Sequence, residues 1–221
     1  MILHEHKIIF VHIPKTAGQS VTNYFLNNIG KDFTLDLPEF GLLENVNLEM
    51  PGPQNHHHMY LDEYVDLGYV KKDELKNYFK FCVIRNPLDR FRSSFYYNRM
   101  HKKFSYKTFL NKVLPRRTEG YERTDLYRHF CPQTNYINSE YGRIDKFFLM
   151  DEYFSINFEN YFQEHYGFTG SLEKDINKTN VKEEKVWEFD DKIKAKLNKV
   201  YKNDVKLYRT LLKHRFDHQA I

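Results

Sequence analysis

Short apolar runs, each followed by a polar turn and then by a helical pattern, recur along the chain. Residues 7–13 read KIIFVHI and residues 79–84 read FKFCVI, and β-branched and aromatic runs of this length predict buried strands. A helical pattern with apolar positions three and four apart follows each run, ending near Gly30 in the first case and covering residues 91–98 in the second. Residues 144–149 predict a third strand. This order is typical of a parallel sheet with crossover helices.

Helical and loop patterns account for the rest of the chain. The further predicted helices are 60–69, 72–78, 107–114, 156–165 and a long amphipathic one over 190–213. The predicted loops are 31–55, 115–125 and 171–182, which are rich in breakers or charges. No repeat or linker divides the sequence, and its length suits one core better than two. We therefore predict a single domain over residues 1–221.

Composition narrows the function classes. The aromatic fraction of 17% can fill a large core, which excludes a disordered chain. The net charge of +4 is too small for a dedicated nucleic-acid binder and suits a pocket for a small polyanion. Cys82 and Cys131 have neither metal-type nor disulfide-type spacing. With no apolar run long enough to cross a bilayer, and a charged N-terminal segment, the sequence predicts a cytoplasmic protein.

The string HIPKTAGQS, residues 12–20, links the first predicted strand to a helix. Such a loop directs unpaired backbone N–H groups outward at a helix N-terminus, where phosphate or sulfate binds. Lys15 adds a positive charge, and Thr16, Gln19 and Ser20 add polar donors. The loop is not a Walker A loop, because its lysine precedes Gly18 instead of following a second glycine. A tight turn capped by Ser20 is the alternative interpretation.

The string CVIRNPLDRFRSSFYYNR, residues 82–99, follows the second strand in the same way. Arg85 comes just after the strand, and Ser93 lies on the helix that follows. Because the carboxyl ends of parallel strands meet at one edge of a sheet, Arg85 should face the same crevice as Lys15. A guanidinium and a hydroxyl there can hold a second phosphate. The alternative is a structural ion pair between Arg85 and Asp89.

Together, HIPKTAG and the later RNPLDRFRSSF resemble the motifs of sulfotransferases that use 3′-phosphoadenosine 5′-phosphosulfate. The chain looks most like the carbohydrate group related to heparan and chondroitin O-sulfotransferases, in a soluble bacterial-type form. The expected fold is α/β, a P-loop-like three-layer α/β/α sandwich with a central parallel sheet. The resemblance assigns Arg85 and Ser93 to the 3′-phosphate. It assigns the 5′-phosphosulfate to Lys15, Thr16, Ala17, Gly18, Gln19 and Ser20.

Three adjacent histidines, His56, His57 and His58, lie between the two motifs. Three neighbouring side chains cannot all point one way, so a metal site built from them alone is not expected. In the family that the chain resembles, a histidine in this stretch is the catalytic base. Counting to the helix that begins YLDEY favours His58, with His57 as the second choice.

Weaker signals lie in the second half of the chain. Gln133, in CPQTNYI, either contacts the ligand or supports the crevice. Asn177 and Lys178 resemble a late family element near the nucleotide, although an exposed loop would look the same. Arg116 and Arg117 either meet an acidic acceptor or are solvated surface charges.

The implied reaction is an in-line displacement at sulfur, in which Lys15 faces the leaving oxygen and the histidine takes the acceptor proton. The implied partners are the nucleotide co-substrate and a hydroxyl-bearing glycan or small metabolite, with no metal, nucleic acid or membrane span. Two rivals are an ATP-dependent phosphotransferase and a nucleotide-binding module without catalysis.

Overall fold

The computed structural model describes residues 1–31, 52–114, 121–173 and 188–215. Its sheet has four strands in the order β1-β2-β3-β4, with bounds β1 Ile2–Leu3, β2 Ile8–Phe10, β3 Phe79–Ile84 and β4 Lys146–Leu149. β2, β3 and β4 are parallel, which confirms the three predicted strands. β1 is antiparallel to β2 and was not predicted, because two residues carry no periodic signal.

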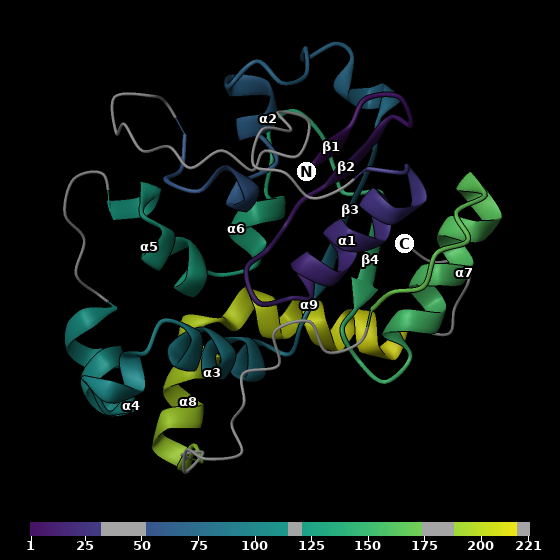
Figure 1. Cartoon of the computed structure of the whole chain (residues 1–221). Coiled ribbons are helices and arrows are strands. Elements are labelled where there is room, and N and C mark those ends of the chain that lie inside the picture. The colour runs from purple at the N-terminus through teal and green to yellow at the C-terminus, as the bar shows by residue number, and fades with distance from the viewer. Residues whose placement is uncertain (32–51, 115–120, 174–187, 216–221) are drawn as a thin grey trace.

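Helices make up most of the remaining described chain (Figure 1). Their bounds are α1 Gly18–Asn28, α2 Glu63–Asp66, α3 Pro87–Tyr97, α4 Tyr106–Thr108, α5 Asp125–Phe130, α6 Thr134–Ile137, α7 Phe154–Tyr166, α8 Asp191–Val200 and α9 Lys202–Lys213. A π-helical turn, Phe109–Val113, continues α4. The 3₁₀ turns are His56–His58, Leu75–Asn77, Met100–Lys102 and Tyr121–Arg123.

Two helix predictions need correction. The long helix predicted over 190–213 is divided into α8 and α9 at Tyr201, which has φ −103° and ψ 32°. The Tyr201 hydroxyl donates to the carbonyl of Phe130 at 2.7 Å and the side chain is buried, so a tertiary contact holds the break. The helix predicted over 72–78 is only the 3₁₀ turn Leu75–Asn77.

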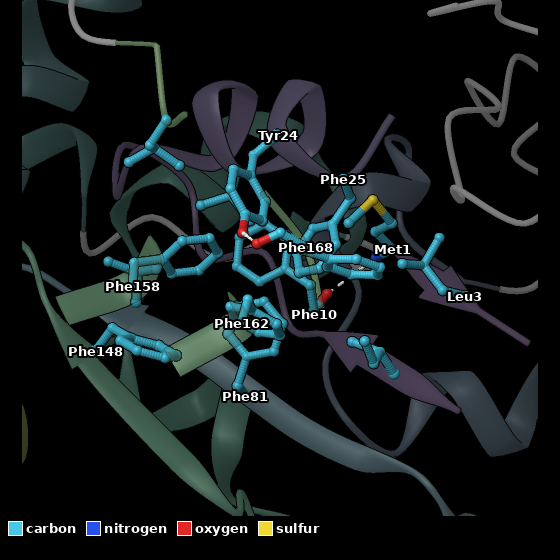
Figure 2. Packing of buried hydrophobic residues seen from close by; sticks show 14 of the residues in the cluster. Met1, Leu3, Phe10, Tyr24, Phe25, Phe81, Phe148, Phe158, Phe162 and Phe168 are labelled. Atoms are coloured by element: carbon cyan, nitrogen blue, oxygen red, sulfur yellow. Dashed lines mark hydrogen bonds between the residues drawn. The ribbon is translucent and has the colours of Figure 1, made fainter. Parts of the chain in front are cut away.

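Both faces of the sheet are covered by apolar side chains. On one face, Phe10, Phe81 and Phe148 pack against aromatic residues of α1 and α7, including Phe25 and Phe158 (Figure 2). On the other face, a second cluster joins the alternate strand positions to residues of α2, α6 and α9. A third cluster lies between α3, α5 and α8. Parallel strands that are buried on both faces require near-continuous apolar runs of this kind.

The two sequence motifs meet at the carboxyl edge of the sheet. β2 and β3 are neighbours, with Phe10 opposite Phe81, and the residues that follow each strand are the ones that carry the motifs. α3, which begins after β3, lies beside α5 (Figure 1). Within the described ranges, no helix combines the length and the apolar composition that crossing a membrane requires.

Candidate functional site

The loop between β2 and α1 has an unusual backbone. Lys15 and Ala17 have φ values of 67° and 64°, in the left-handed region that non-glycine residues seldom adopt. The Thr16 hydroxyl donates to the carbonyl of Ile13 at 2.8 Å, which closes the loop on itself. Ala17 occupies the N-cap position and has no side-chain acceptor for the amides of the first turn. A helix end of this kind attracts an anion.

Gly18 is required at the start of α1 by a close approach of His12. A Cβ atom at this position would lie 1.6 Å from Nε2 of His12, well inside any permitted contact. The His12 ring stacks on Phe10, with ring centroids 5.3 Å apart, and its edge faces the ring of His58 at 5.0 Å. His12 thus joins the loop to the histidine turn, a role that sequence reasoning missed. The only signal was a polar residue in an otherwise apolar strand run.

Gly18→Ala should therefore destabilise the protein by about 1–3 kcal/mol, as overpacking of a filled site does. Chemical denaturation measures this change. The double variant His12→Ala with Gly18→Ala should be less destabilised than the sum of the two single variants, because removing the ring makes room for the methyl group. Simple additivity of the two single effects would contradict the contact.

Arg85 follows β3 and contacts the loop directly. Its Nη1 atom donates to the carbonyl of Lys15 at 3.1 Å. Its backbone is held by the buried side chain of Gln133, which accepts from the Arg85 N–H at 3.1 Å and donates to the Arg85 carbonyl at 2.9 Å. The Gln133 side chain thus supports the backbone of Arg85, and its contact with a ligand remains a prediction. Asp89 pairs with Arg92 at 3.8 Å, so the alternative Arg85–Asp89 pair is not formed.

Lys15 and Arg85 create a positive region at the loop. The Lys15 ammonium lies 3.8 Å from the ring centroid of Tyr97, on α3. Burial, together with the charge of Arg85, lowers the pKa of Lys15 to about 8, so it remains mostly protonated at neutral pH. No carboxylate in the described ranges forms an ion pair with either cation. The region is suited to a bound anion.

α3 carries the second predicted phosphate contact. The Asn86 side chain caps the helix by accepting from the N–H of Leu88 at 2.9 Å, and Pro87 begins it. Ser93 is half-buried, and its side-chain hydroxyl makes no hydrogen bond to another described residue. Its neighbour Ser94 is buried and donates to the carbonyl of His129 at 2.9 Å. The structure therefore leaves the hydroxyl of Ser93, and not that of Ser94, available for a ligand.

The three adjacent histidines diverge, as the sequence predicted. The Nδ1 atom of His56 lies 3.3 Å from the hydroxyl of Tyr69, whereas the Nδ1 atom of His58 lies 2.8 Å from a carboxylate oxygen of Asp125. The Nδ1 atom of His57 is buried without a hydrogen-bond partner in the described chain. One turn of backbone thus sends the three rings to three different environments.

Asp125 and His129 of α5 complete a cluster that the sequence did not reveal. The second carboxylate oxygen of Asp125 lies 3.4 Å from Nε2 of His129, and the rings of His58 and His129 are nearly perpendicular, 5.2 Å apart. We call His58, Asp125 and His129 the histidine–aspartate cluster. Next to this cluster, the ring of Tyr97 stacks on the ring of His129, with ring centroids 5.1 Å apart. Tyr97 therefore contacts both Lys15 and this cluster.

The charges of the cluster follow from burial and hydrogen bonding. Burial lowers the pKa of His57 to about 3 and that of His129 to about 4. Burial, reinforced by the neighbouring histidines, also lowers the pKa of His12. Burial alone would raise the pKa of Asp125, but hydrogen bonds from His129 and His58 hold it below its usual range. At neutral pH the carboxylate is therefore charged, and these three rings are neutral.

Two buried arginines hold the site together. Arg128 donates to both carboxylate oxygens of Glu63, at 2.7 and 2.8 Å, and to the carbonyl of His58 at 3.3 Å. Arg90 donates to the carbonyls of Pro14 at 3.0 Å, Cys131 at 2.8 Å and Arg128 at 3.3 Å. The guanidinium of Arg90 thus links the loop between β2 and α1, which we call the anion loop, to α5, which carries the histidine–aspartate cluster.

Several predicted site residues lie outside the described residues. These are Arg116, Arg117, Asn177 and Lys178. Among the described residues, the structure brings together the loop of residues 15–20, Arg85 with Gln133, and His58.

Comparison with known proteins identifies the family. The family model described as "Sulfotransferase family" matches residues 1–209 of the 221-residue chain. No curated protein and no solved structure matches significantly. Because the match covers nearly the whole chain, including the anion loop, Arg85 and the histidine–aspartate cluster, this chain belongs to the sulfotransferase family, whose members are sulfuryl-transferring enzymes.

Proposed function

We propose that this protein transfers the sulfuryl group of 3′-phosphoadenosine 5′-phosphosulfate to a hydroxyl group of a saccharide. The observation that carries the proposal is the pairing of two sites at one sheet edge. Lys15 and Arg85 form a cationic region at the loop between β2 and α1, where Gly18 lies against His12. The His12 ring in turn contacts the ring of His58, which pairs with Asp125. An anionic donor and a proton-losing acceptor need these two environments side by side.

In this proposal the loop holds the reactive end of the donor. The first-turn amides of α1 and the Lys15 ammonium bind the 5′-phosphosulfate, and Gly18 lets the loop approach it. Gln19 and Ser20 add donors from the first turn, whereas the Thr16 hydroxyl is already bonded to Ile13 and contributes its amide. Arg85 and Ser93 bind the 3′-phosphate. Asn177 and Lys178 are proposed to approach the nucleotide from the later segment.

His58 is the proposed base. Its Nδ1 atom faces Asp125, which leaves Nε2 as the ring nitrogen that accepts a proton. His57, the second choice, is a poorer base, since burial lowers its pKa to about 3. The proton leaves the acceptor hydroxyl as its oxygen attacks sulfur, and the sulfur–oxygen bond to the 5′-phosphate breaks. Lys15 offsets the charge that develops on that phosphate.

The acceptor class and the finer fold assignment belong to the same proposal. Tyr97 is exposed, but the Lys15 ammonium and the His129 ring already lie against its ring, so the saccharide class rests on the sequence motifs. Arg116 and Arg117 would meet acidic groups of such an acceptor. The helices on both faces and the loop after β2 fit a P-loop-like α/β/α sandwich, and the motifs favour the carbohydrate O-sulfotransferase group in a bacterial-type form.

Adenosine 3′,5′-bisphosphate should stabilise the protein, and ATP with magnesium should not. At about 100 times its dissociation constant, the bisphosphate adds about 2.7 kcal/mol to the free energy of unfolding. Thermal unfolding measures the effect, and Arg85→Ala should abolish it. Arg209→Ala, which removes an exposed cation on α9, should preserve it.

The opposite pattern would contradict the proposal. Stabilisation by ATP and magnesium without a response to the bisphosphate would favour a phosphotransferase. Binding of the bisphosphate without transfer to any of a broad set of saccharides and small hydroxyl compounds would favour a module that has lost catalysis.

A further inference from the structure

We propose that Asp125 is a positioning residue of this site, which fixes the tautomer and orientation of His58 so that Nε2 faces the acceptor. The inference rests on the proposed function, and it assigns a role to a residue on a helix that the sequence did not predict. Three observations support it: the geometry of the carboxylate, the environment of the neighbouring histidines, and the hydrogen bonds that hold both partners.

The carboxylate of Asp125 uses its two oxygens for two different rings. One oxygen lies 2.8 Å from Nδ1 of His58 and the other 3.4 Å from Nε2 of His129. An ionised carboxylate only accepts hydrogen bonds, so each of these nitrogens carries the proton. His58 is thereby fixed as the Nδ1–H tautomer. Its unprotonated nitrogen is Nε2, the atom a general base requires.

Proton transfer then leaves the new charge next to its counterion. The acceptor proton moves to Nε2 of His58, the acceptor oxygen bonds to sulfur, and the electron pair of the breaking bond goes to the 5′-phosphate. The resulting imidazolium keeps its Nδ1–H bond to Asp125. Without the carboxylate, that charge would form beside neutral rings in a buried site, which is costly.

Among the groups that surround His58, Asp125 is its hydrogen-bonded charged partner. The groups facing it are His12 after β2, His57 on the same turn, His129 and Asp125 on α5, and Arg90 on α3 near His129. Asp125 is the one carboxylate among them. Burial holds the other three histidines in the neutral form at neutral pH. His129 serves as a second donor that fixes the carboxylate.

Both partners are held in place by other contacts. Asp125 begins α5, whose N-cap residue Thr124 accepts from the Tyr127 N–H at 3.2 Å, and the Asp125 N–H donates to the Gln54 side chain at 3.3 Å. On the other side, the Arg128 guanidinium binds the His58 carbonyl. The 2.8 Å contact is therefore one of several that join α5 to the segment of residues 54–58, and the others keep both partners in place, as a positioning role requires.

Asp125→Asn tests the role with little change in shape. The amide can donate to Nδ1 of His58, which moves the ring proton to Nε2 and blocks base catalysis. We expect turnover to fall by about 10²–10⁴-fold, with the affinity for adenosine 3′,5′-bisphosphate unchanged. Nitrogen-15 NMR of the histidine rings should show Nδ1–H in the native His58 and Nε2–H in the variant. Asp145→Asn is the control. It removes the carboxylate that precedes β4 and pairs with Lys80 of β3, and it should change neither the turnover nor the tautomer of His58.

Three results would overturn the inference. They are an Nε2–H tautomer of His58 in the native protein, turnover of Asp125→Asn within about threefold of native, or a stoichiometric metal ion bound at Nδ1 of His58. If Asp125→Asn does not fold, the native tautomer alone decides. The NMR measurement needs no substrate, so failure of the proposed function, seen as absent bisphosphate binding, is distinguishable from failure of this role.

Discussion

Glu63→Ala is expected to lower the free energy of unfolding by about 3–5 kcal/mol, because it leaves a buried charge without its partner. The Arg128 side chain is 2% exposed, and its guanidinium makes a two-pronged bond to Glu63 while its face packs on Tyr60, 3.6 Å from the ring centroid. Glu63 also accepts from the Tyr60 N–H at 2.6 Å. Removing the carboxylate therefore leaves a buried cation without its counterion and the Tyr60 N–H without its acceptor.

Urea denaturation of the native protein and the variant measures this effect. Glu74→Ala is the matched control, since Glu74 pairs with exposed Lys71 at 3.6 Å on the surface, and it should cost less than about 1 kcal/mol. Equal effects for the two variants would show that the Arg128 pair contributes no more than a surface contact.

Lys15→Met is expected to reduce turnover by about 10²–10³-fold, the usual effect of removing one group that stabilises developing charge. Methionine keeps much of the apolar stem that packs on Tyr97 and removes the ammonium. Since the pKa of Lys15 in the free protein is about 8, kcat/KM should also fall as the pH rises through this value, because the ammonium loses its proton.

Steady-state kinetics across pH 6–10 test both statements. Lys72→Met is the control, because the Lys72 ammonium also lies over a tyrosine, 4.6 Å from the ring centroid of Tyr141, but belongs to no part of the site. It should leave turnover and the alkaline decline unchanged. An alkaline decline that persists in Lys15→Met would assign it to another group.

Sequence patterns predicted the parts of this fold that local chemistry determines. The three parallel strands followed from apolar runs, and the positions of Lys15 and Arg85 at one sheet edge followed from strand order. α5 was not predicted, since its six residues are too few for a periodic signal, and only its first residue falls in the predicted loop 115–125. The break at Tyr201 was missed because the apolar spacing continues through it.

The parts of the candidate site that sequence patterns did not predict depend on contacts between residues that are far apart in the sequence. Asp125 lies 67 positions from His58 in the sequence, so no local pattern joins them. Counting to the next predicted helix favoured His58 over His57, whereas the contact of His58 with a carboxylate is visible only in three dimensions. The resemblance assigned Gly18 to the 5′-phosphosulfate, whereas the close approach of the His12 ring, which requires a glycine there, became visible only in three dimensions.

The guanidinium of Arg90 has a consequence for how variants of this protein can be engineered. It binds the carbonyl that precedes Lys15 and two carbonyls at the end of α5. These acceptors are backbone atoms, so side chains on α5 can be exchanged without removing the link. A shift of that backbone by a fraction of an ångström, however, would be transmitted to the loop between β2 and α1. Libraries that vary acceptor preference should therefore randomise exposed side chains around the site and keep the length of the segment between α5 and α6 constant.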